Sequence, residues 1–317
     1  MNKTYALPPE LGSPIFDRNV KGRVNMSNQH IFALKTVLDG LMRRYRERVP
    51  NVSKIVSKMI EQGMVDHMDN IVNDHIAFRT LGVAHLGIQS LEKIFMAYGY
   101  TRQDYYHFEQ KKLNAYWYSP PEIIPNLPRI FISECRVHDL STPMQALIQK
   151  YAGKISQDPV DQLDLTNGEV VDQFLHTRLW DQPTWDDYKL ANDESEYVSW
   201  VLNNQYYLNH FTISVHALPT GYNTIEQFND FLESIGIQLN DSGGKVKVSH
   251  DGKLRQSAAV SNTVDFLFQT TSGDPVQATV PGSYVEFAER IDGRDGFDPG
   301  NANNIFESTY SDQIDRT

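Results

Sequence analysis

Apolar and polar positions recur along this chain with two different periods, and the change of period divides the sequence. Between residues 27 and 48 apolar side chains return every three or four positions, as they do on the buried face of a helix. Ser27 precedes this run as a candidate N-cap, and a second apolar run with helical spacing follows Ser53. We therefore expect residues 27–65 to form N-terminal helices.

After residue 70 the period shortens to that of β-strands. His75–Thr80 alternates polar and apolar positions, and a helical pattern over Ser90–Tyr98 ends at Gly99. Three more strand-like runs follow, at Tyr100–Phe108, Leu113–Tyr118 and Arg129–Val137. The order strand, helix, strand, strand, strand predicts a βαβββ module over residues 70–140.

The same order of elements returns in the second half of the chain. A strand-like run at Asn209–His216 precedes a helical pattern at Thr224–Ile235. Further strand-like runs lie at Ser257–Val260, Val264–Gln269 and Tyr284–Arg290. The segments D-H-I-A-F-R and N-H-F-T-I-S open the two copies, and an internal repeat implies two similar units packed together. We predict an α+β fold in which this second βαβββ module, residues 206–292, joins the first in one cupped mixed sheet.

Three segments lie outside this repeat. Residues 141–205 are polar, contain tryptophan and show helical stretches, and we interpret them as a helical insert that covers the cup. The hairpin-like stretch 244–253 is interpreted as an insertion within the second module, and residues 293–317 as a C-terminal tail. We expect the whole chain, residues 1–317, to form a single domain.

Strand alternation gathers reactive side chains on one face of the predicted cup. His75 and Arg79 share a face of their strand, because side chains two apart point the same way. His210 occupies the matching place in the second module, and Glu286 lies on the closing strand of that module. Two neutral imidazoles and one carboxylate form the ligand set of non-haem Fe(II) oxygenases. The three are a candidate metal site, although each alone would be an ordinary polar strand residue.

Glu134 and Arg79 leave two alternatives open. Glu134 lies on the closing strand of the first module, where Glu286 lies in the second. If both carboxylates bound a metal, the site would have four protein ligands, fewer open positions and Lewis-acid chemistry. Arg79 has the fork geometry that grips a substrate carboxylate, but a structural ion pair, for instance with Glu134, would also explain it.

Composition limits the kinds of partner that the protein can bind and the cellular compartments in which we expect it. The chain has 40 Asp and Glu against 29 Lys and Arg, and its net charge of −11 argues against a nucleic-acid partner. No apolar run reaches the ~18 residues that a membrane-spanning helix needs. The first 14 residues contain no continuous apolar segment, so we expect no secretory signal. The single cysteine, Cys135, has no partner for an internal disulfide, and we expect a cytoplasmic protein.

Several segments together carry a resemblance to a known family. They are H-I-A-F-R-T, P-R-I-F-I-S-E, S-E-Y-V-S-W-V-L, N-H-F-T-I-S-V, L-R-Q-S-A, G-S-Y-V-E-F-A-E-R and G-F-D-P-G-N-A-N-N-I-F-E-S-T. With them the chain resembles the 2-oxoadipate dioxygenase/decarboxylase family, also called hydroxyglutarate synthase, of the vicinal oxygen chelate superfamily. The resemblance runs from about residue 28 to the end of the sequence.

The resemblance implies an enzyme whose Fe²⁺ is held by His75, His210 and Glu286. Arg79 would grip the carboxylate of a 2-oxo acid, and we expect Gln256 to line the pocket. The implied reaction converts 2-oxoadipate and O2 into 2-hydroxyglutarate and CO2, within lysine degradation. The stretch Q-S-A-A at residues 256–259 departs from the family, in which a serine–threonine pair is expected there. The resemblance therefore defines the substrate less well than it defines the metal.

Two other functions are compatible with the same cupped fold. One is a glyoxalase-like isomerase or lyase that uses Glu134 as a fourth metal ligand and needs no O2. The other is a metal-free protein that binds a small molecule. Replacing Glu134 by glutamine separates the two metal-dependent functions, since loss of metal binding would favour the four-ligand site. The sequence does not define the oligomeric state.

Overall fold

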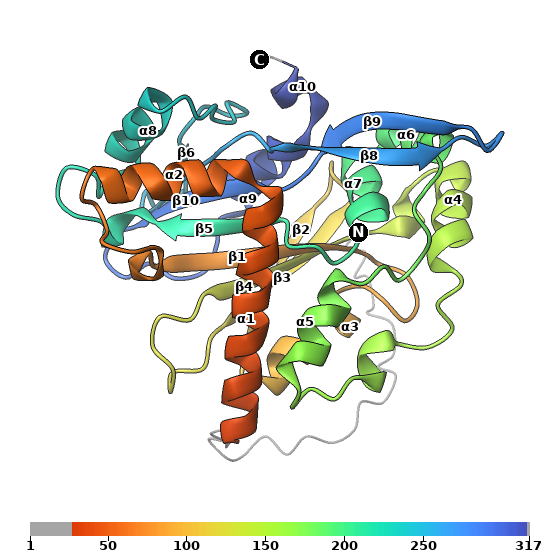
Figure 1. Ribbon diagram of the computed structural model, residues 1–317, viewed down its shortest axis with the longest axis horizontal. Helices are drawn as coiled ribbons and strands as arrows, with labels where there is room; N and C mark the ends of the chain where they lie inside the picture. Colours follow the sequence, from red (N-terminus) through yellow and green to blue (C-terminus); the bar gives the residue numbers. More distant parts are fainter. Residues whose placement is uncertain (1–26, 316–317) are drawn as a thin grey trace, which may run out of the picture.

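An eight-stranded mixed sheet forms the centre of this computed structural model, which describes residues 27–315 (Figure 1). Its strand order is β2-β3-β4-β1-β5-β10-β7-β6. The strands are β1 (Asn73–Leu81), β2 (Thr101–Phe108), β3 (Leu113–Ser119), β4 (Arg129–Cys135), β5 (His210–Ser214), β6 (Lys247–Val248), β7 (Leu254–Ala258) and β10 (Tyr284–Arg290). The expectation about the first 14 residues lies outside the described range.

The two modules repeat one pairing pattern. In the first, β4 pairs parallel with β1 and antiparallel with β3, which pairs antiparallel with β2. In the second, β10 pairs parallel with β5 and antiparallel with β7, which pairs antiparallel with β6. Helix α3 (Ile88–Ala97) and helix α8 (Ile225–Ser234) follow the first strand of each module, and β1 joins β5 antiparallel. The predicted α+β fold of two βαβββ modules in one cupped sheet is confirmed.

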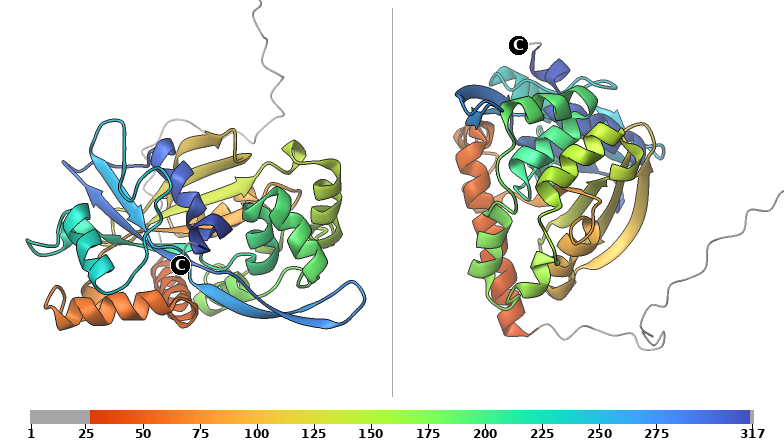
Figure 2. Two further views of the ribbon diagram at one scale, coloured as in Figure 1. Left: turned by 90° about the horizontal axis from the view of Figure 1, so that it is seen from above. Right: turned by 90° about the vertical axis from the view of Figure 1, so that its right-hand side faces the viewer.

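The edge of the second module differs from the prediction. The stretch 244–253 contains β6, the outermost strand and the counterpart of β2, so it is not an insertion. The run at Val264–Gln269 instead forms β8 (Thr263–Gln269), which pairs only with β9 (Pro275–Pro281) in a separate hairpin that Figure 2 shows as a long arm. A strand of two residues is too short to show an alternating pattern, whereas β8 alternates because one face packs on a helix.

Helices α3 and α8 cover the convex face of the sheet. The rings of Phe78 and Phe95 lie 5.4 Å apart in the first module, and those of Phe287 and Phe228 lie 5.4 Å apart in the second. The N-terminal helices α1 (Asn28–Arg48) and α2 (Pro50–Glu61) form as predicted, and α1 crosses in front of β1 and β5 in Figure 1. Helices therefore cover the strand face opposite the candidate site (Figure 1).

The insert and the C-terminal segment share the covering of the cup, which was expected of the insert alone. The insert contains α4 (Thr142–Ala152), α5 (Gly168–His176), α6 (Trp185–Glu194) and α7 (Glu196–Asn204). Only α7 among these helices supplies rings beside Arg79, whereas the space above His75 is covered by α9 (Pro299–Ile305) and the turn Phe306–Thr309. A short helix, α10 (Ser311–Ile314), follows. The cup is thus closed mainly by the C-terminal segment. None of the helices described is both long and apolar enough to cross a membrane.

Candidate metal centre

Three neighbouring strands bring His75, His210 and Glu286 together on the concave face. The Nε2 atoms of the two histidines lie 3.3 Å apart, and the Glu286 carboxylate lies 3.1 Å from His210 Nε2 and 3.5 Å from His75 Nε2. The candidate ligand atoms all lie within 4.8 Å of one another, and all three side chains are buried. Within residues 27–315 this is the one such group of histidine, cysteine or carboxylate side chains.

The residue before each histidine holds its ring. Asp74 Oδ1 lies 2.8 Å from His75 Nδ1, and Asn209 Oδ1 lies 3.0 Å from His210 Nδ1. An oxygen at Nδ1 places the ring proton there and leaves the Nε2 lone pair facing the cluster, which is the tautomer that a metal ligand needs. Asp74 is itself held by two hydrogen bonds from Arg290, of 2.7 and 2.9 Å.

Burial and neighbouring charges set different proton affinities in the cluster. Burial alone would lower the pKa of His75, but the carboxylates of Glu286 and Asp74 outweigh it, and the pKa lies above its usual value. Burial, reinforced by the nearby His75 and Arg79, holds the pKa of His210 well below its usual value. Burial also opposes ionisation of Asp74, but the Arg290 guanidinium keeps the pKa of that carboxyl well below its usual range. The cluster thus combines one carboxylate with two imidazoles in a buried site, a donor set that suits a cation.

The strand registers explain why the cluster has a single carboxylate. Ala77 on β1 pairs with Phe131 on β4, and the matching Thr212 on β5 pairs with Glu286 on β10. Phe131 therefore occupies in the first module the place that Glu286 occupies in the second, and its ring lines the cavity beside the cluster. An apolar ring at this position leaves three protein ligands instead of four.

Glu134 does not lie in the cluster, contrary to the four-ligand alternative. It is three residues beyond Phe131 on β4, and its Oε2 accepts a hydrogen bond of 2.8 Å from the backbone N–H of Ile88, where α3 begins. The expected match between Glu134 and Glu286 was wrong because the closing strands were compared by composition, without the pairing register that fixes which residues correspond.

Arg79 is buried without an acidic partner among the described residues. Its Nη1 donates to Thr309 Oγ1 at 2.8 Å, and its Nη2 donates to the carbonyl of Phe306 at 3.0 Å. The rings of Tyr197 and Trp200 lie 5.1 and 5.3 Å from the guanidinium carbon. Its Nε has no hydrogen-bond partner. The alternative of a structural ion pair with Glu134 is therefore not observed.

Gln256 lies in the cavity lining, as expected. Its Nε2 donates to Glu286 Oε1 at 2.6 Å. Tyr284 lies in the same lining, and its buried hydroxyl has no hydrogen-bond partner. Sequence reasoning missed Tyr284 and the two residues that hold the histidine rings. For Asp74 and Asn209 a signal was present, because an acid or its amide precedes the histidine in both copies of the repeat.

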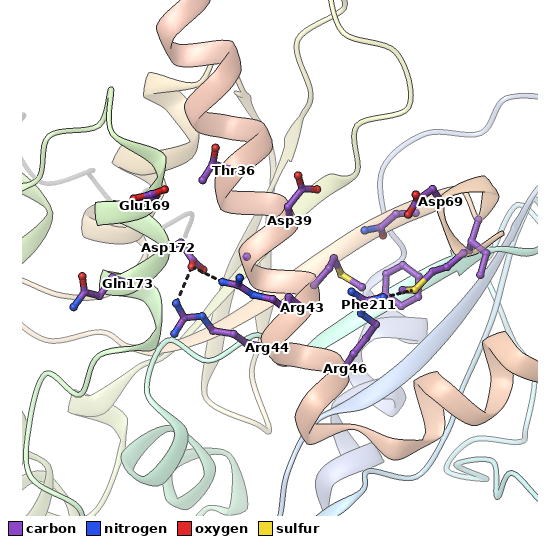
Figure 3. Close-up of a pocket in the computed structure, with 15 residues that line it drawn as sticks. Thr36, Asp39, Arg43, Arg44, Arg46, Asp69, Glu169, Asp172, Gln173 and Phe211 are labelled. Carbon is purple, nitrogen blue, oxygen red and sulfur yellow. Dashed lines mark hydrogen bonds and ion pairs between the residues drawn. The ribbon is translucent and has the colours of Figure 1, made fainter.

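The cavity at the cluster is small, about 20 Å³, which is room for roughly one water molecule. A much larger groove of about 1000 Å³ lies between α1 and α5 and contains none of the three cluster residues. Figure 3 shows the Asp172 carboxylate there between Arg43 and Arg44, with the ion pairs measuring 3.7 and 2.8 Å. This larger groove is therefore not the place where the candidate ligands converge.

Comparison with known proteins identifies relatives over most of the chain. A rice (Oryza sativa subsp. japonica) protein named 2-oxoadipate dioxygenase/decarboxylase, chloroplastic/amyloplastic, is 38% identical over 309 residues, which cover 89% of this chain and 80% of the relative. The Arabidopsis thaliana protein named 2-oxoadipate dioxygenase/decarboxylase, chloroplastic, is 41% identical over 268 residues, covering 77% of this chain and 69% of the relative. The crystal structure of rice hydroxyglutarate synthase in complex with 2-oxoadipate matches with a TM-score of 0.79 and 34% identity, covering 97% and 100% of the two chains.

These relatives correct the expected compartment. Both plant proteins carry plastid names, so the expectation of a cytoplasmic protein is wrong. A lone thiol and the lack of a long apolar run do not separate cytosol from plastid, because transit peptides are not continuous apolar segments.

The family model described as 2-oxoadipate dioxygenase/decarboxylase matches residues 37–293, which include all three cluster residues. On this match and on the similarity to the two plant proteins, the chain belongs to the 2-oxoadipate dioxygenase/decarboxylase family.

Proposed function

We propose that this protein is an Fe²⁺-dependent dioxygenase/decarboxylase that converts 2-oxoadipate and O2 into 2-hydroxyglutarate and CO2. The observation that carries the proposal is the buried cluster of His75, His210 and Glu286 in a chain of this family. The reaction balances: one carbon of the six-carbon acid leaves as CO2, and both atoms of O2 remain in the products. A place in lysine degradation stays a prediction.

The donor set fits a divalent iron. His75 Nε2, His210 Nε2 and a Glu286 carboxylate oxygen would hold the ion, and three ligands leave three of six octahedral positions open. Without a cation or a proton between them, these converging lone pairs and this carboxylate repel one another in a buried site. Fe²⁺ bound there would supply the electrons that O2 activation requires. Asp74 and Asn209 would keep the two imidazoles in their binding tautomer.

Arg79 would bind the carboxylate at the far end of the substrate. A buried guanidinium without a carboxylate partner is costly, and an anionic ligand relieves that cost. Arg79 Nε and the Tyr284 hydroxyl are both buried donors without partners, so both are available to a polar ligand. The bonds from Arg79 to Thr309 and to the Phe306 carbonyl would then be exchanged for bonds to the substrate.

The small cavity implies that the substrate enters a cup that must first open. About 20 Å³ does not hold a six-carbon diacid, so the C-terminal segment that carries Ile305 and Phe306 has to shift outward. Once the segment closes again, the rings of Phe131, Phe297 and Phe306 would exclude water from the reacting centre. These residues supply shelter and orientation, and no side chain of the cup is needed as a redox group.

The test is O2 consumption by anaerobically Fe²⁺-loaded protein given 2-oxoadipate. We expect equal amounts of O2 consumed, CO2 released and 2-hydroxyglutarate formed. Zn²⁺-loaded protein should consume no O2, and the His210→Ala variant should lose both iron binding and turnover. If the Fe²⁺-loaded protein neither consumes O2 nor releases CO2, the proposed reaction is wrong. If the protein turns over a 2-oxo acid of another length but not 2-oxoadipate, only the assignment of the substrate is wrong.

A further inference from the structure

A chain of hydrogen bonds from α9 reaches the Glu286 carboxylate. Gln256 Nε2 donates to Glu286 Oε1 at 2.6 Å, and Asn301 Nδ2 donates to Gln256 Oε1 at 2.9 Å. The same amino group of Asn301 also donates to the backbone carbonyl of Leu254 at 3.3 Å. Asn301, Gln256 and Glu286 are each 1 to 2% exposed, so water does not compete for these bonds. We call this chain the Asn301 relay.

The relay has one consistent direction. A side-chain amide can turn either its oxygen or its amino group toward a neighbour. The Leu254 carbonyl can only accept a hydrogen bond, so Asn301 must turn its amino group toward it. Gln256 then accepts from Asn301 through its oxygen, and its own amino group faces Glu286. Asn301 thereby selects the orientation of Gln256 that suits a carboxylate.

The relay engages one oxygen of the candidate ligand and leaves the other free. Oε1 of Glu286 accepts from Gln256 and lies 3.5 Å from His75 Nε2, while Oε2 lies 3.1 Å from His210 Nε2 and receives no bond from the relay. A carboxylate that binds an octahedral ion through one oxygen leaves one more coordination position open than a carboxylate that binds through both. We propose that Asn301 is a positioning residue: acting through Gln256, it makes Glu286 bind the metal through one oxygen only. This inference rests on the proposed function.

The first module has no such relay. The pairing registers match Ala115 with Gln256 and Phe131 with Glu286, so apolar residues occupy both places in the module that supplies no carboxylate. The relay is therefore tied to the carboxylate and is not a general feature of the fold. Because Asn301 belongs to α9, which covers the cup, the position of this cover and the orientation of the ligand are coupled.

Asn301→Asp tests the relay with Co²⁺ as the probe. Aspartate has nearly the same shape but no amino group, so its oxygens would face two acceptors and Gln256 would have to turn. We expect about tenfold weaker Co²⁺ binding, the lower end of the usual effect of groups that orient metal ligands. The visible Co²⁺ spectrum, which reports coordination number, should also change. The control is Asn303→Asp, the same charge change on the same helix outside the relay, which should keep the wild-type spectrum.

A second variant separates an effect through Gln256 from a general loss of structure. Gln256→Met removes the amide and should itself weaken Co²⁺ binding and change the spectrum, even if Asn301→Asp fails to fold. Adding Asn301→Asp to Gln256→Met should then have little further effect, because Asn301 acts only through Gln256. Wild-type spectra in either single variant, or effects that simply add, would overturn the relay alone. A different result would overturn the metal site and the proposed function as well: Co²⁺ binding that is absent in the wild-type protein, or that is unchanged in the His210→Ala variant.

Discussion

Glu134 and Glu289 hold equivalent positions in the two modules, and each accepts a hydrogen bond from the first backbone amide of the helix in its own module. The bonds from Ile88 N to Glu134 and from Ile225 N to Glu289 both measure 2.8 Å. A carboxylate at this place satisfies an amide that has no partner within the helix and complements the helix dipole. The repeat thus assigns both residues a structural role and leaves Glu286 without an acidic counterpart in the first module.

Replacing Glu134 by glutamine should therefore leave metal binding intact. The amide keeps an oxygen for Ile88 N but loses the negative charge at the start of α3, so the free energy of unfolding should fall by about 1 kcal/mol or less. Metal titration and urea denaturation of the variant measure the two effects. Loss of stoichiometric metal binding would instead support a site with four protein ligands.

Phe131→Glu should convert the site toward the four-ligand arrangement. The register places this position opposite Glu286 across the pseudo-symmetric cup, so a carboxylate there can reach the same ion. We expect tighter Zn²⁺ binding and at least about tenfold slower O2 uptake with 2-oxoadipate, because fewer coordination positions stay open. Phe131→Gln is the matched control for loss of the ring without added charge. Equal Zn²⁺ affinity in the two variants would contradict the assignment of Phe131.

Arg79→Met should raise KM for 2-oxoadipate about 100-fold while Fe²⁺ affinity changes little. Removing one partner of a buried charge pair costs about 2–5 kcal/mol, and Arg79 touches no atom of the cluster in the hydrogen bonds it makes. Steady-state kinetics with 2-oxoadipate and with 2-oxohexanoate, which lacks the second carboxylate, separate the roles. An equal loss with both substrates would show that Arg79 supports the fold and does not bind the distal carboxylate.

Lys247 should make stability depend on pH in alkaline solution. Its ammonium is buried on β6, donates to the Asn240 carbonyl at 2.7 Å, and burial lowers its pKa to about 8. An unfolded lysine keeps its proton to a pH of about 10.4, so between these values the unfolded chain binds more protons and the free energy of unfolding rises with pH.

The slope contributed by Lys247 is at most about 1.4 kcal/mol per pH unit. Lys247→Met should remove it, so that the variant is more stable than wild type at neutral pH and this advantage shrinks as the pH approaches about 10. Urea denaturation of both proteins across this range measures the difference. The same pH dependence in both proteins would show that Lys247 titrates normally.

Sequence patterns predicted most of the fold, and their failures have physical causes. Alternation and the repeat located His75, His210 and Glu286, because the concave face must be polar where it binds a polar ligand. The patterns could not supply the register, which is a property of paired strands, and so Glu134 was matched to Glu286. Asn301 was beyond reach for another reason: its contact with Gln256 joins elements that are neighbours only after the C-terminal segment has folded over the cup.

The order of the elements along the chain has a consequence for biosynthesis. His75, His210 and Glu286 emerge from the ribosome far apart, and the segment with Asn301, Phe306 and Thr309 follows all of them. The contacts that close the cup can therefore form only after the strands that carry the three side chains have been synthesised. The closing segment thus completes the surroundings of the candidate site last, through its hydrogen bonds with Arg79 and Gln256.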